Sequence, residues 1–153
     1  MRIRLFIGAL ALVTALVFDA CGFEGSEEDA WAHGYARGYE VGERLDNYYY
    51  GDLAEIADAP ADIQGRLEEQ ADRAFWNFAM MEAAAASLLK NDSTCWEGYH
   101  AGYFDWFWDR FLPVDLSDAE LEAFDVEFQN ELAEFKHMPI VLDSVETMQN
   151  EGC

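Results

Sequence analysis

Three glycines recur at intervals of four residues in the stretch AHGYARGYEVGERL, at Gly34, Gly38 and Gly42. Glycine in a helix interior costs about 1 kcal/mol relative to alanine, so this spacing needs a structural reason. At the angular step of an α-helix the three glycines fall in the middle of one apolar stripe. Small residues four apart let a second helix approach the bare backbone. We therefore expect a helix over residues 29–50 that packs through its glycines. The alternative is a glycine-rich loop, which would not need this period.

The same motif returns further along the chain, where Gly98 and Gly102 are each followed by a tyrosine. We expect a helix over residues 94–111, with aromatic side chains around more than half of its circumference. A helix this apolar is buried on more than one side. Its two glycines lie outside the aromatic arc. The glycine-bearing parts of the two helices are expected to approach each other or a shared neighbour.

The rest of the chain also shows helical rather than strand periodicity. We expect further helices over residues 61–90 and 117–136, and a short terminal helix or apolar arm from Pro139 onward. Residues 51–60 are expected to break the chain, with Asp58 capping the helix that follows. The predicted fold class is all-α, an antiparallel bundle of about four helices with short loops and close glycine-mediated packing.

Two capping boxes are predicted, in which a hydroxyl and an acidic side chain three residues apart satisfy the first amides of a helix. The first pairs Thr94 with Glu97, and the second pairs Ser117 with Glu120.

Residues 1–22 are interpreted as a signal peptide, because two arginines precede about fourteen apolar residues, too few for a typical membrane span. Lipidation of Cys21 and ordinary cleavage after Gly22 are both consistent with the small residues at this boundary. An uncleaved N-terminal anchor is the third option. Residues 23–153 then form a single acidic helical domain, located in the cell envelope or secreted. Any membrane attachment is expected only through the N-terminal signal or a lipid anchor.

The two cysteines outside that segment are Cys95 and Cys153. In an oxidising compartment we expect them to form a disulfide that ties the last residue to the start of a helix. The alternative is two free thiols.

The charge is strongly negative, with 31 Asp and Glu against 9 Lys and Arg, a formal net charge of −22. Such a field repels phosphates, so nucleic acid is excluded as an expected partner. It attracts a basic protein, a cationic ligand or divalent cations. An acidic coat that serves only solubility is the simpler interpretation.

Three ionisable residues are candidates for a buried site: Glu82, Glu97 and His100. If the two central helices form a hairpin, Glu82 lies nearly opposite His100 in an aromatic core. One histidine with two carboxylates is a minimal ligand set for a divalent metal such as zinc, iron or manganese. A Glu82–His100 ion pair without any cofactor and an acid/base catalytic pair are the alternatives. A second Glu-x-x-His spacing at Glu134 and His137 faces water, so a di-iron bundle is not expected.

Aromatic residues supply candidates for partner binding. Tyr48, Tyr49 and Tyr50 form either an exposed patch or, for two of the three, a cover over the core. Trp106 and Trp108 point in different directions, so one is expected at the surface. An exposed Trp108 beside Asp105 and Asp109 would suit a cationic, partly apolar partner.

These features favour a non-catalytic binding module, such as an inhibitor or immunity-type protein for a basic partner. The alternative function is a metal-binding or acid/base enzyme centred on Glu82, Glu97 and His100.

Overall fold

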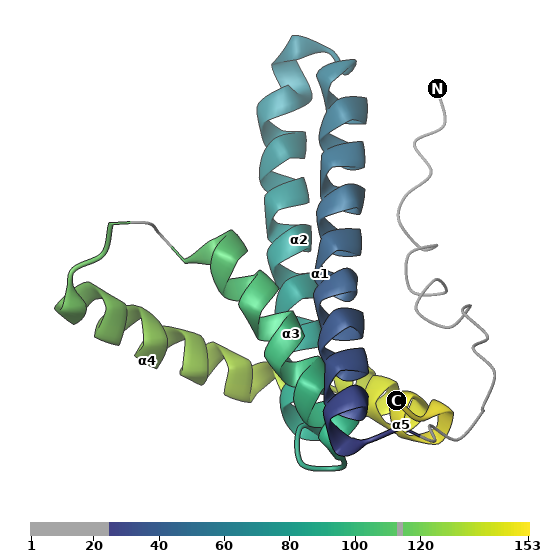
Figure 1. Ribbon diagram of the computed structural model, residues 1–153. Coiled ribbons are helices and arrows are strands. Elements are labelled where there is room, and N and C mark those ends of the chain that lie inside the picture. The colour runs from purple at the N-terminus through teal and green to yellow at the C-terminus, as the bar shows by residue number, and fades with distance from the viewer. Residues whose placement is uncertain (1–24, 113–114) are drawn as a thin grey trace.

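The computed structural model describes residues 25–112 and 115–153, which are almost entirely helical and contain no strand (Figure 1). The prediction of an all-α fold is confirmed, although this part of the chain holds five helices rather than about four. The signal peptide predicted over residues 1–22, with Cys21, lies outside the described residues. The helices are α1 Glu27–Ala57, α2 Ala61–Leu89, α3 Thr94–Phe111, α4 Asp118–Phe135 and α5 Pro139–Glu151.

Two long helices, α1 and α2, form a tall hairpin, and the three shorter helices lie beside its lower part, at its base or sloping away from it (Figure 1). α1 and α2 run antiparallel, and α3 returns beside them, parallel to α1. α5 lies across the base, near the start of α1. α4 slopes away from the hairpin and contributes only Phe128 and Leu132 to the buried residues. The predicted antiparallel arrangement therefore holds between successive helices α1, α2 and α3, while α4 does not run alongside them.

The closest contact in the fold joins α1 to α3, and glycine makes it possible. A Cβ atom at Gly34 would overlap the carbonyl oxygen of Cys95, and one at Gly38 would overlap that of Tyr99. A Cβ at Gly42 would penetrate the ring of Trp106. The backbone of α1 therefore lies directly against α3, as the glycine spacing predicts.

The contact is reciprocal. A Cβ at Gly98 would overlap the carbonyl oxygen of Trp31, and one at Gly102 would overlap that of Tyr35. Each helix thus presents bare backbone to the carbonyl groups of the other. Approach this close also permits Cα–H···O=C contacts, which contribute about 0.5–1 kcal/mol each. We call this contact the glycine seam.

On its other side α3 packs against α2 through large aromatic residues that meet small ones. The hydroxyl of Tyr103 donates to the carbonyl oxygen of Ala79 at 2.8 Å, so its polar end is satisfied in the core. Four consecutive buried alanines in α2, Ala83 to Ala86, make room for these rings and for the neighbouring helices.

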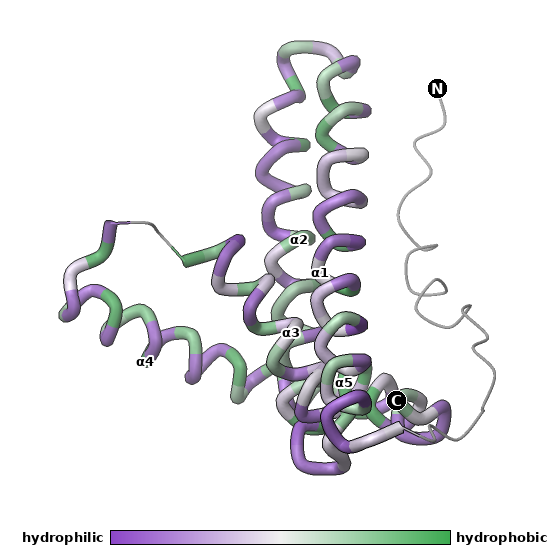
Figure 2. Tube along the Cα trace, viewed as in Figure 1, coloured by the Kyte–Doolittle hydropathy of each residue, from purple (hydrophilic) through white to green (hydrophobic). Residues whose placement is uncertain are grey.

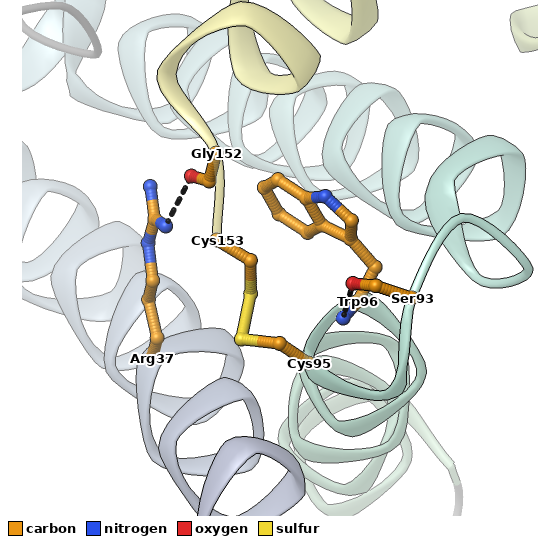
Figure 3. Close-up of a disulfide and its surroundings, with 6 residues drawn as sticks. All are labelled: Arg37, Ser93, Cys95, Trp96, Gly152 and Cys153. Atoms are coloured by element: carbon orange, nitrogen blue, oxygen red, sulfur yellow. Dashed lines mark hydrogen bonds between the residues drawn. A yellow bond between two sulfur atoms is a disulfide. The ribbon is translucent and has the colours of Figure 1, made fainter. Parts of the chain in front are cut away.

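Cys95 and Cys153 form a disulfide with their Cα atoms 6.0 Å apart, as predicted (Figure 3). Beside it, the guanidinium of Arg37 donates to the carbonyl oxygen of Gly152 at 3.1 Å and lies 5.5 Å from the ring centre of Trp96. The end of α5 is therefore attached to both helices of the glycine seam.

One predicted boundary is wrong. α1 does not end near Tyr50 but continues through Gly51 to Ala57. The amide of Asp58 donates to the carbonyl oxygens of Glu55 and Ile56, so Asp58 ends α1 and does not cap α2. Pro60 stands at the N-cap of α2 instead, without a side-chain hydrogen bond.

The two predicted capping boxes have different outcomes. Ser93, rather than Thr94, caps α3, and its hydroxyl accepts from the amide of Trp96 at 3.2 Å. The box at Ser117 and Glu120 is confirmed, with the Ser117 amide donating to the Glu120 carboxylate at 2.9 Å.

Replacing Gly38 with alanine tests the glycine seam. The added methyl would push against the backbone of Tyr99, which has no rotamer through which to yield. We expect Gly38→Ala to lower the free energy of unfolding by about 1–3 kcal/mol, despite the better helix propensity of alanine. The measurement is urea unfolding followed by circular dichroism.

Gly65 in α2 is the matched control, because nothing lies within 4 Å of the position of its added Cβ. Gly65→Ala is expected to stabilise the protein by about 0.5–1 kcal/mol. Equal effects of the same sign at both positions would contradict the seam.

Reduction of the disulfide should also destabilise the fold. Its cysteines are 58 residues apart in sequence, and closing a loop of that length is worth about 4 kcal/mol through the entropy of the unfolded chain. We expect a reductant to lower the urea midpoint of the wild type and to leave that of a Cys95→Ser, Cys153→Ser double variant unchanged. A wild-type midpoint insensitive to reductant would refute this expectation.

Candidate partner-binding site

A row of three aromatic side chains runs along the outside of α1, next to the glycine seam. The rings of Trp31 and Tyr35 stack with centres 5.2 Å apart, and those of Tyr35 and Tyr39 stack at 6.5 Å. Their spacing of four residues places them on one helix face. Because α1 and α3 are so close, this row reaches the neighbouring face of α3. The hydroxyl of Tyr35 donates to a carboxylate oxygen of Asp105 at 2.7 Å.

An open, shallow groove of about 550 Å³ lies between these two faces. We call it the α1–α3 groove, and it is lined by Tyr35, Tyr39, Asp105, Trp108 and Asp109. Both aspartates are exposed, whereas both tyrosines and Trp108 are partly buried. The groove thus combines aromatic faces with carboxylates that remain accessible to water.

This combination suits a cation. A cationic group over an aromatic face is worth about 0.5–1 kcal/mol at an exposed site, and carboxylates add charge-assisted hydrogen bonds. The hydrogen bond to Asp105 raises the pKa of Tyr35, with smaller contributions from burial and from the charges of Asp105 and Asp109. Tyr35 therefore remains a neutral donor that helps to orient Asp105.

The nearest cation in the sequence is engaged elsewhere. Arg110 follows Asp109, but its guanidinium donates to Asp46 at 2.8 Å and lies 5.2 Å from the ring centre of Phe75. Among the described residues, those that line the groove include no lysine or arginine. Arg110 thus does not occupy the groove.

Three residues predicted for partner binding, Asp105, Trp108 and Asp109, do come together here. Trp106 is the buried member of its pair, and its indole nitrogen donates to Asp46 at 2.7 Å. Tyr35 and Tyr39 were not predicted as site residues, because each follows a glycine of the stripe and so lies on a flank of the apolar face. Their spacing with Trp31 was the signal that could have identified them.

The structure keeps the tyrosine run apart from this groove. Tyr48 and Tyr50 are 55% and 56% exposed, so only one of the three covers the core, not two as expected. Tyr49 stacks on Phe75 at 4.5 Å, and its hydrogen bond to Asp72 is the main cause that raises its pKa to about 12.

The three residues proposed as a metal or catalytic cluster are not gathered. Glu82 accepts a hydrogen bond from the hydroxyl of Tyr99, the residue next to His100. His100 packs on Phe104 with ring centres 4.4 Å apart, and Glu97 is exposed. In residues 25–112 and 115–153, no three His, Cys, Asp or Glu side chains are arranged to hold a metal ion.

Burial shifts the pKa values of Glu82 and His100 in the directions that favour the uncharged form of each side chain. It raises the pKa of the Glu82 carboxyl, against smaller lowering effects from Tyr99, Arg44 and Arg37. It is also the largest cause that lowers the pKa of His100 to about 4, helped by the charges of Lys90 and Lys136. His100 is therefore a neutral packing residue at pH 7, so it forms no ion pair with Glu82.

Comparison with known proteins adds no relative. The chain matches no family model, and searches of curated proteins and of solved structures found no match. Within the described ranges, none of the helices has both the length and the apolar character that a bilayer crossing requires.

The raised pKa of Glu82 predicts an unusual pH dependence. A carboxyl that holds its proton more tightly in the folded state disfavours folding increasingly as pH rises above its ordinary value of 4.5. Glu82→Gln removes this effect and keeps an acceptor for Tyr99. We expect its free energy of unfolding, relative to the wild type, to increase as pH rises from about 4 to 8.

Urea unfolding across this pH range is the measurement. Glu68→Gln removes one exposed carboxylate from the same helix and serves as the control. The same pH trend in both variants would show that general charge repulsion, rather than burial of Glu82, is responsible.

Proposed function

We propose that this protein is a non-catalytic binding module that captures a basic protein through the α1–α3 groove. The observation that carries the proposal is the meeting of three aromatic side chains and two exposed aspartates from two different helices. Each group suits the side chains of lysine and arginine, which carry both a charge and an apolar stem.

The overall charge supports the same function. With a formal net charge of −22, the protein attracts a basic partner before contact and accelerates its association. The groove then supplies the short-range contacts that a diffuse acidic surface lacks. An inhibitor or immunity-type role, in which an acidic protein occupies a basic enzyme or toxin, uses both effects.

We further propose that the protein works in the cell envelope or in secreted form. The Cys95–Cys153 disulfide supports an oxidising compartment. The N-terminal sequence, with two arginines before an apolar run, is typical of an export signal.

Neutralising the groove tests the function. The mature chain is immobilised and exposed to an extract of the native cell envelope. We expect it to retain a basic protein that elutes at high salt, since screening weakens interactions between exposed charges. Asp105→Asn with Asp109→Asn should weaken binding about tenfold or more, because a hydrogen bond to a charged group is worth about 1.5–3 kcal/mol.

The control variant carries Glu127→Gln and Glu134→Gln, which remove two exposed carboxylates from α4 at positions outside the groove. It should retain the partner as the wild type does. Equal losses of binding in both double variants would show that the interaction depends on net charge and not on the groove. If the wild type retains no basic protein, the proposal is refuted.

A further inference from the structure

A second groove adjoins the first where α3 meets α4. It has a volume of about 630 Å³, and we call it the α3–α4 groove. Four apolar residues line it, Trp108, Leu112, Leu121 and Phe124, together with three exposed acidic residues, Asp118, Glu122 and Asp125.

Trp108 belongs to both grooves, so the two form one continuous surface. Its ring packs against Phe128 at 4.7 Å and against Phe124 at 6.2 Å, with ring centres measured in both cases. The tryptophan is therefore held by α4 while one side of it faces the α1–α3 groove. A ligand that lies across Trp108 contacts the aromatic and acidic residues of α1 and α3 on one side of this ring and the apolar residues of α4 on the other side.

The α3–α4 groove exists because α4 is attached mainly through its C-terminal half. Phe128 and Leu132 are buried, whereas Leu121, about two turns before Phe128 on the same stripe, is 45% exposed. Figure 2 shows apolar residues recurring along α4 where this helix slopes away from the hairpin. The first half of α4 thus presents an apolar face that the described residues leave partly uncovered.

The charged residues that line the α3–α4 groove indicate what kind of partner covers the apolar face of α4. Asp118, Glu122 and Asp125 line the groove beside the apolar residues, and no lysine or arginine is found among the described residues that line it. A second copy of this chain would bring the same acidic residues together, against a net charge of −22 on each molecule. A partner that presents apolar and basic residues together matches both kinds of lining residue.

We infer that the ligand is a basic amphipathic helix of the partner, bound across both grooves. This inference rests on the proposed function and specifies its ligand. The basic side chains of the helix contact Asp105, Asp109 and the acidic residues of the α3–α4 groove. Its apolar side chains, spaced three and four residues apart, contact Trp108, Leu121 and Phe124. Because of this apolar contact, the protein should bind such a helix more tightly than a chain that carries only cationic side chains.

Three synthetic peptides of about 18 residues, or five helical turns, provide the probes. The first places leucines on one helix face and lysines on the other. The second has the same composition in an order that destroys the apolar face, and the third is oligolysine. Affinities are measured by fluorescence anisotropy at fixed ionic strength. We expect the amphipathic peptide to bind at least about tenfold more tightly than the other two.

Two matched substitutions then locate the apolar contact. Leu121→Gln should weaken binding of the amphipathic peptide about fivefold to tenfold and leave oligolysine binding unchanged. Leu142→Gln on α5 is the control, because Leu142 is 49% exposed and lies outside both grooves. Circular dichroism verifies that both variants remain helical.

The outcomes separate this inference from the proposed function. If Asp105→Asn with Asp109→Asn weakens all three peptides while Leu121→Gln affects none, the first groove binds cations but the helix inference is overturned. If neither the double aspartate variant nor Leu121→Gln differs from its control variant, both the proposed function and the helix inference are refuted. A change in the sedimentation of the protein alone on Leu121→Gln would show that a second copy covers the groove, and would also overturn the inference.

Discussion

The backbone-to-backbone contact between α1 and α3 is the constraint on which the rest of this structure depends. Five glycines lie along it, each at a helix position where a methyl group would meet a carbonyl group or a ring. Their intrinsic cost in helix propensity is several kcal/mol in total, at about 1 kcal/mol each. Packing of the two helices along their length offsets that cost. Because both helices carry glycines, the contact also fixes their relative register and their parallel direction.

That register determines which residues the tyrosines next to the seam glycines contact. Tyr99 and Tyr103 of α3 reach α2, where their hydroxyls bond to Glu82 and to the carbonyl of Ala79. Tyr35 of α1 stays outside and bonds to Asp105. The same contact that builds the core therefore creates the α1–α3 groove on its outer side. A change in register would separate Tyr35 from Asp105 and remove the groove together with the core packing.

Two of the nine lysine and arginine residues of this protein are engaged in contacts between helices. Arg37 is held at the disulfide by Gly152 and Trp96, and Arg110 lies between Asp46 and a set of aromatic rings. Both guanidinium groups thus serve internal packing. The carboxylates of the two grooves are exposed, and no lysine or arginine is among the described residues that line either groove.

The sequence by itself determined the helices, the glycine stripe, the disulfide pair and three residues of the groove. These follow from local periodicity, from the small size of glycine and from there being two cysteines beyond the N-terminal segment, so they require no knowledge of which elements meet. The sequence left open whether the two glycine-bearing helices meet each other or a shared neighbour, and the tertiary structure decided that α3 is the partner of the stripe. The tertiary structure alone decided that Tyr35 and Tyr39 join Asp105, and that Glu82 bonds to Tyr99 rather than to His100. It also decided that α4 diverges. Those outcomes depend on rotation and register between helices, and a difference of one residue on α3 turns a side chain by 100° about its axis.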